Sequence, residues 1–137
     1  MAFEWKTNPN LPDPKWFLPL VIIFSITFFF IVAVFADTAS WYDRASCQRE
    51  GTSGIMANGK ELRDEALTCA SWDYAFGTYL RVSNIDNGKS VVVVVSDRGP
   101  AKRLYNKGRK IDLSRAAFRA IADLKRGVIK VAIKEVR

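Results

Sequence analysis

The sequence contains no histidine and only two cysteines, Cys47 and Cys69, among its 137 residues. A zinc site would need carboxylates in place of the usual imidazole and thiolate ligands, so the composition argues against a zinc protein. The two cysteines are most simply explained as a disulfide. It would stabilise a small domain by about 3 kcal/mol and imply an oxidising compartment outside the cytoplasm. Two free, buried thiols are the alternative.

Charged residues are absent from residues 16–36. As a helix this apolar run would span roughly 30 Å, the thickness of the hydrocarbon core of a bilayer, so we expect it to enter a membrane. We favour a retained transmembrane anchor. A signal peptide is the alternative, since Val34 and Ala36 are small residues at the spacing of a cleavage site. No cysteine lies at the end of the run, which argues against lipid attachment, and residues 1–15 are expected to form a disordered leader.

Basic residues outnumber acidic residues, 21 to 14, which gives a net charge of +7. Two of each precede position 37, so the whole excess falls in the remaining chain. A basic surface can meet nucleic acid, anionic lipid or an acidic polymer. The positive charges are dispersed and form no nucleic-acid motif. We therefore expect a cell-wall polymer or a lipid surface as partner, although the basic cluster within residues 102–110 is equally consistent with a solvated loop.

Five consecutive valines lead into Ser-Asp-Arg-Gly-Pro at residues 91–100. Such a run of β-branched residues predicts a strand buried on both faces. Since Gly99 and Pro100 end the strand, Asp97 is expected at the mouth of an apolar core, where partial loss of solvent suits a carboxylate to proton transfer. The alternative is that Asp97 only pairs with Arg98 or caps the turn.

Three other strands are predicted, at residues 39–43, 78–84 and 128–136. The turn signal at residues 86–88 should join the second of these to the valine strand as a hairpin. Many short strands, one short helix and no repeats suggest a small closed β-barrel in residues 37–137.

The one predicted helix begins after Ser114, a good N-cap, and runs to about Arg126, with Gly127 placed to end it. Asp112, just before it, is expected to order the start of this helix rather than to take part in chemistry.

Six short blocks together resemble the rare lipoprotein A (RlpA) family, the septal-ring lytic transglycosylases with a double-psi β-barrel. The resemblance covers roughly residues 38–134. The blocks, in order, are ASWY at 39–42, MANG at 56–59, FGT at 76–78, NGKSVVV at 87–93, DRGP at 97–100 and GRKIDLS at 108–114.

The resemblance implies a six-stranded double-psi barrel that binds peptidoglycan glycan strands in the cell envelope. It also implies non-hydrolytic cleavage between N-acetylmuramic acid and N-acetylglucosamine, leaving a 1,6-anhydro end. One carboxylate can protonate the glycosidic oxygen and then, as a base, take the proton of the sugar's 6-hydroxyl, so no metal or other cofactor is expected. On the DRGP match, Asp97 is that residue.

The chain departs from the family at two positions. Lys60 stands where many members have glutamate, and Ser71 stands where many have histidine. Glu61, one position after Lys60, is therefore a second candidate catalytic residue. The predicted substrate-binding residues are Tyr42, Asn58, Trp72, Arg98 and Tyr105, whose aromatic members could stack on sugar rings.

Two other functions stay open. One is a non-catalytic, expansin-like module that binds peptidoglycan through the same barrel. The other is a structural protein whose barrel binds another envelope protein, with protein partners that the sequence does not identify.

Overall fold

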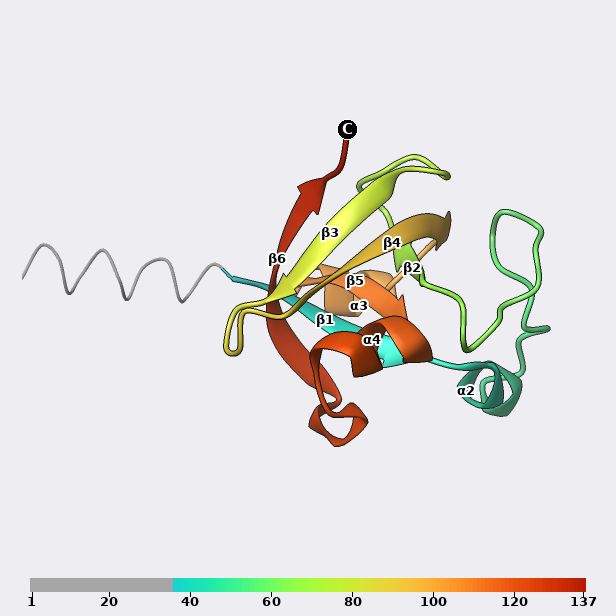
Figure 1. Ribbon diagram of the computed structural model, residues 1–137. Helices are drawn as coiled ribbons and strands as arrows, with labels where there is room; N and C mark the ends of the chain where they lie inside the picture. Colours follow the sequence, from blue (N-terminus) through green and yellow to red (C-terminus); the bar gives the residue numbers. More distant parts are fainter. Residues whose placement is uncertain (1–35) are drawn as a thin grey trace, which may run out of the picture. The chain divides into compact units, whose positions relative to one another are not determined.

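The computed structural model describes residues 36–137, which form a closed barrel of six strands (Figure 1). The strand order around the barrel is β1-β5-β2-β4-β3-β6, and the predicted closed β-barrel is confirmed. The elements in chain order are β1 (Asp37–Tyr42), α2 (Arg44–Arg49), β2 (Thr68–Ser71), β3 (Tyr79–Asn84), β4 (Ser90–Asp97), α3 (Lys102–Tyr105), β5 (Arg109–Ser114), α4 (Arg115–Ile121), η2 (Leu124–Arg126) and β6 (Val128–Glu135).

Two of the neighbouring strand pairs are parallel, β1 with β5 and β2 with β4, and the other four are antiparallel. The predicted hairpin is present, because β3 and β4 pair in antiparallel register from Tyr79 opposite Val94 to Ser83 opposite Ser90. The parallel pairs join strands that are distant in sequence. They bring the ends of β1, β4 and β5 close enough to share one pocket.

The valine strand is buried on one face only, so the prediction of burial on both faces is wrong. Val91, Val93 and Val95 are at most 9% exposed, whereas Val92 is 38% exposed. The reason is architectural, since a barrel is a single layer whose strands alternate between the core and the outer surface.

Helix α4 closes the core from one side. Its residues Ala117, Phe118 and Ile121 are fully buried and pack with apolar residues of the barrel strands. Their spacing of one, three and four positions gives α4 a single apolar face. Phe118 is the largest of the fully buried side chains in the described residues.

The prediction of a single helix is wrong, because α2 and α3 are also present. Helix α2 starts at a capping box in which the Asp43 carboxylate accepts from the Ser46 N–H at 2.7 Å and the Ser46 hydroxyl accepts from the Asp43 N–H at 3.0 Å. The predicted helix after Ser114 also stops early, at Ile121. There the Asp123 side chain accepts from the Lys125 N–H and starts a separate 3₁₀ turn.

Cys47 and Cys69 are free thiols, so the predicted disulfide is wrong. Cys69 lies in β2 and is fully buried in the barrel core, where burial raises the pKa of its thiol to about 12. Cys47 lies on α2, which contributes no residue to the core. The two thiols therefore face different surroundings, and the argument for an oxidising compartment loses its support.

The predicted leader, residues 1–15, and all but the last residue of the predicted membrane segment, residues 16–36, lie outside the described residues. Within residues 36–137 no helix is both long enough and apolar enough to cross a membrane.

Candidate active site

A pocket of about 440 Å³ lies where the ends of β1 and β4 meet β5, α2 and the loop between α2 and β2. Its wall contains three carboxylates, together with a phenol, a thiol and two guanidinium groups. These residues are Asp97, Asp112, Glu50, Tyr42, Cys47, Arg98 and Arg109. Three of them, Asp97, Tyr42 and Arg98, were predicted as site residues.

Asp97 is the last residue of β4 and is half-buried. Its Oδ1 accepts hydrogen bonds from the backbone N–H groups of Ala57 and Arg98, each at 2.8 Å. The Tyr42 hydroxyl donates to Oδ2 at 3.4 Å. All three neighbours are donors, which matches an ionised carboxylate because it can only accept.

Asp112 also lines the pocket, although it was not predicted as a site residue. It lies in β5 directly opposite Ser40 of β1, and the Ser40 hydroxyl donates a hydrogen bond to its Oδ1. Burial raises the pKa of Asp112, and the charges of Glu50 and Asp97 add to this, while the Ser40 hydrogen bond and Arg109 oppose it. Asp112 therefore holds a proton to higher pH than an ordinary aspartate does.

The turn after Asp97 passes close to Asp112. A Cβ added at Gly99 would lie 3.6 Å from the Asp112 Oδ2 and 3.2 Å from the Ala70 Cβ, a contact tighter than nearly all real Cβ atoms make. Glycine at this position thus lets the DRGP turn pack tightly against Ala70 of β2, while its distance from Asp112 would be an ordinary contact for any side chain.

Ser114, and not Asp112, caps helix α4, since its hydroxyl accepts from the Ala117 N–H. The prediction that Asp112 orders the helix start is wrong. The parallel pairing of β1 with β5 turns its side chain to the pocket instead.

Tyr42 stays a neutral phenol at physiological pH. Burial and the charge of Asp97 together hold its pKa far above the usual range. It can therefore donate a hydrogen bond to Asp97 and does not act as a base.

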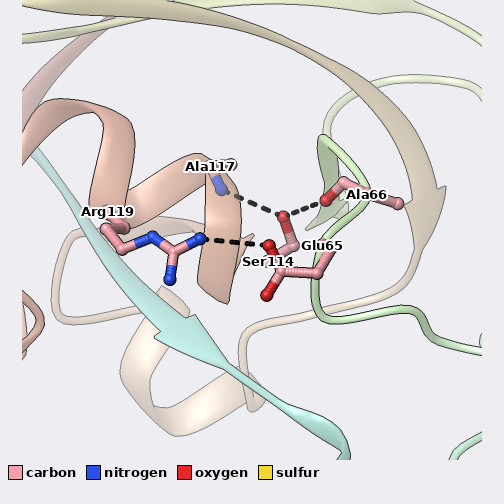
Figure 2. Close-up of polar contacts among 5 residues, drawn as sticks. All are labelled: Glu65, Ala66, Ser114, Ala117 and Arg119. Atoms are coloured by element: carbon pink, nitrogen blue, oxygen red, sulfur yellow. Dashed lines mark hydrogen bonds and ion pairs between the residues drawn. The ribbon is translucent and has the colours of Figure 1, made fainter.

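The loop between α2 and β2 supplies the Ala57 N–H and is held at its tip and at the end next to β2. Near its tip the Asn58 N–H donates to the Ser96 carbonyl at 3.2 Å. Figure 2 shows the other end, where the Ser114 hydroxyl donates to the Ala66 carbonyl at 2.6 Å and Arg119 pairs with Glu65 at 3.0 Å. These contacts fix the loop that holds Asp97.

Glu61 and Asn58 do not reach the wall of this pocket. Glu61 forms an ion pair with Arg44 and lines a separate hollow beside Lys60. The Asn58 side chain accepts from the Lys60 N–H at 3.0 Å and so shapes the loop tip.

Arg98 lines the pocket without pairing to the Asp97 side chain. Its guanidinium donates to the carbonyls of Ser71 and Tyr74, each at 2.7 Å, and lies 3.9 Å from the centre of the Phe76 ring. Arg98 thus holds the chain that follows β2 against the rim of the pocket.

Trp72 and Tyr105 lie next to the pocket but not in its wall. The Trp72 indole N–H donates to the Pro100 carbonyl at 2.7 Å, and the Tyr105 hydroxyl donates to Asp73. A lysine ammonium lies over each ring, Lys102 over Trp72 and Lys110 over Tyr105.

Within residues 36–137 there is no group of three or more cysteine, aspartate or glutamate side chains placed to hold a metal ion.

Comparison with known proteins places this chain in a family. The lytic transglycolase family matches residues 34–133. The RlpA protein of Synechocystis sp. is 42% identical over 99 residues, and the protein named endolytic peptidoglycan transglycosylase RlpA in Pseudomonas aeruginosa is 36% identical over 99 residues. Each match covers 72% of this chain, but only 28% and 26% of the respective relative. The chain thus spans little more than a quarter of these relatives.

Solved structures agree on the fold. A papain inhibitor from Streptomyces superposes with a TM-score of 0.55 at 26% identity, covering 74% of this chain and 93% of the inhibitor. An expansin from Clavibacter michiganensis superposes with a TM-score of 0.51 at 25% identity, covering 74% of this chain and 49% of the expansin. The six-stranded barrel is the double-psi β-barrel that the resemblance implied, and the chain belongs to the lytic transglycolase family, as the RlpA proteins do.

Proposed function

We propose that this protein is an endolytic peptidoglycan lytic transglycosylase of the cell envelope. It would cleave the bond between N-acetylmuramic acid and N-acetylglucosamine and leave a 1,6-anhydro end. The names of the RlpA relatives support the substrate and the reaction. The observation that carries the proposal is the pair of carboxylates, Asp97 and Asp112, in one pocket with different hydrogen-bond partners.

Asp112 is the proposed general acid, because its raised pKa keeps a proton available. It gives this proton to the glycosidic oxygen, and the bond from that oxygen to C1 of the muramyl sugar breaks with the electron pair going to oxygen. The N-acetylglucosamine side leaves with a free 4-hydroxyl, and positive charge develops at C1.

Asp97 is the proposed general base. It takes the proton of the muramyl 6-hydroxyl while that oxygen bonds to C1 and closes the anhydro ring. One proton leaves Asp112 and one arrives at Asp97, so exchange with solvent restores both groups and no water is consumed. The Ala57 and Arg98 N–H groups and Tyr42 orient the Asp97 carboxylate for this step.

A simpler scheme gives both roles to Asp97 in turn and leaves Asp112 as a structural group. Of the proposed substrate-binding residues, Tyr42 and Arg98 lie in the pocket wall. Asn58 and Glu61, on the loop beyond it, are candidates for contact with a strand that extends past the pocket. Attachment to the membrane through residues 16–36 also remains part of the proposal.

Replacing Asp97 by asparagine is expected to lower the release of 1,6-anhydro ends from purified sacculi by about 10²–10⁴-fold, because asparagine cannot accept the 6-hydroxyl proton. Mass spectrometry of the soluble products measures these ends. Asp86→Asn, which removes only an exposed ion pair with Arg126 at 3.5 Å, is the matched control and should leave the rate unchanged. Equal rates for Asp97→Asn and the wild type would contradict the proposed role.

The expansin-like barrel supports a second candidate, a module that binds glycan without cutting it. The same assay separates the two functions. Wild-type protein that sediments with sacculi but releases no anhydro ends would favour the binding module.

A further inference from the structure

Two lysines and two aromatic rings alternate beside the pocket, in a row that we call the lysine–aromatic ladder: Trp72, Lys102, Tyr105 and Lys110. The Lys102 Nζ lies 3.7 Å from the centre of the Trp72 ring and 5.4 Å from that of the Tyr105 ring. The Lys110 Nζ lies 3.8 Å from the Tyr105 ring centre. At these distances each ammonium group is attracted to the negative face of a ring.

The rings of the ladder are held in place by hydrogen bonds at their polar ends. Trp72 donates to the Pro100 carbonyl at 2.7 Å, and Tyr105 donates to the Asp73 carboxylate, which raises the pKa of Tyr105. Free lysine side chains lose much rotational freedom when they bind a partner. Because the fixed rings already restrict Lys102 and Lys110 in the free protein, these side chains lose less rotational freedom when they bind a partner.

The two ammonium groups have no carboxylate partner among residues 36–137. The ion pairs found there belong to Arg44, Arg119 and Arg126, on other elements. The rings attract the ammonium groups but carry no net charge, so within the described residues the positive charge of each ammonium is not paired with a carboxylate. Arg103 and Lys107, exposed in the same segment, add positive charge around it.

The ladder adjoins the pocket through shared backbone. Pro100, Ala101 and Leu104 line the pocket, and Lys102 and Tyr105 follow them in the same turn and in α3. Arg109 lines the pocket, and Lys110 is the next residue of β5. A polymer that leaves the pocket on this side therefore meets the ladder next.

We infer that Lys102 and Lys110 form a binding subsite for the carboxylates of a glycan strand seated in the pocket. This inference rests on the proposed function, since it takes the strand to be peptidoglycan. Muramyl sugars carry a carboxylate on their lactyl group when the stem peptide is absent, and the stem peptide carries carboxylates of its own when present. An ammonium held over a ring suits either source. Trp72 and Tyr105 were predicted to stack on sugar rings, whereas in the ladder these rings position the two lysines.

The inference is tested by binding in the full chain, with Asp97→Asn in every protein so that no strand is cut. Three fluorescently labelled strands of equal length serve as probes: glycan without stem peptides, glycan with stem peptides, and a neutral β-1,4-linked N-acetylglucosamine oligomer. The test variant is Lys102→Gln with Lys110→Gln. The control is Lys125→Gln with Lys134→Gln, an equal change of charge at exposed residues of η2 and β6.

The test variant is expected to bind at least one carboxylate-bearing strand about tenfold more weakly at low salt, and the neutral oligomer as well as before. This loss of affinity should become smaller in about 1 M salt, because salt screens exposed charges. Which of the two peptidoglycan probes responds identifies the source of the carboxylate. An equal loss for both double variants, an equal loss for the neutral oligomer, or no loss would overturn the inference. Failure of the proposed function is seen separately, as a wild type that releases no anhydro ends.

Discussion

Asp112→Asn is expected to lower the release of 1,6-anhydro ends by about 10³-fold, as loss of a general acid does. Asparagine has nearly the same shape and can still accept the hydrogen bond from Ser40, but it has no proton to give to the glycosidic oxygen. Binding of glycan should change little, because the pocket keeps its volume. Rates on purified sacculi, together with binding of a glycan probe, separate these two effects.

The same substitution has a predicted effect on stability with a defined sign. The pKa of Asp112 is higher in the folded state than in the unfolded chain, where it is about 3.9. The stability that this group contributes is therefore fully present below the unfolded pKa and is lost as pH rises through the folded pKa. Asp112→Asn removes this loss, so the variant should be as stable as the wild type at neutral pH, or more stable by up to about 1 kcal/mol.

Chemical denaturation at a series of pH values measures this change in the free energy of unfolding.

The scheme in which Asp97 alone does the chemistry predicts near wild-type rates for Asp112→Asn. Such rates would remove Asp112 from the mechanism while leaving Asp97 in it. The wild-type rate should also fall as pH rises through the pKa of Asp112, because the acid is then lost.

Phe118→Ala is expected to destabilise the barrel by about 4 kcal/mol. The side chain is fully buried where α4 packs on the strands, and its loss leaves a cavity that the closed barrel cannot easily collapse. In a domain of this size such a loss lowers the melting temperature by about 15 °C or more. Denaturant unfolding followed by circular dichroism gives the free energy of unfolding.

Val92→Ala is the control for the core substitution. Val92 is an apolar residue that faces outward from β4 and is 38% exposed, so its truncation should cost less than about 1 kcal/mol. Similar losses for the two variants would show that α4 does not hold the core together as described.

Local sequence signals predicted the parts of the fold that depend on neighbours in the chain. The turn at residues 86–88 set the β3–β4 hairpin, and alternation along residues 128–136 predicted β6. Two strands, β2 and β5, were missed. Strand β2 is only four residues long and fully buried, so it shows no alternation to detect. Strand β5 offers only the short alternation Ile111-Asp112-Leu113 directly before a helix cap. Helix α2 has a signal that could have been used, the Asp43–Ser46 capping box.

The candidate site was predicted only in part, because some of its contacts join residues that are distant in the sequence. Asp97 follows an obvious strand and was identified, whereas Asp112 joins the site through residues distant in the sequence, such as Ser40, which is 72 residues away. Parallel pairing of β1 with β5 creates that contact, and no local pattern encodes it. The disulfide prediction failed likewise, because cysteine spacing does not tell which cysteine enters the core.

Digestion of purified sacculi in oxygen-18 water tests the central claim most directly, namely that the pocket of Asp97 and Asp112 closes the sugar's own 6-hydroxyl onto C1. The account predicts anhydro ends that carry no oxygen-18, because no water enters the new bond. Reducing ends labelled with one oxygen-18 atom would show hydrolysis and would contradict it.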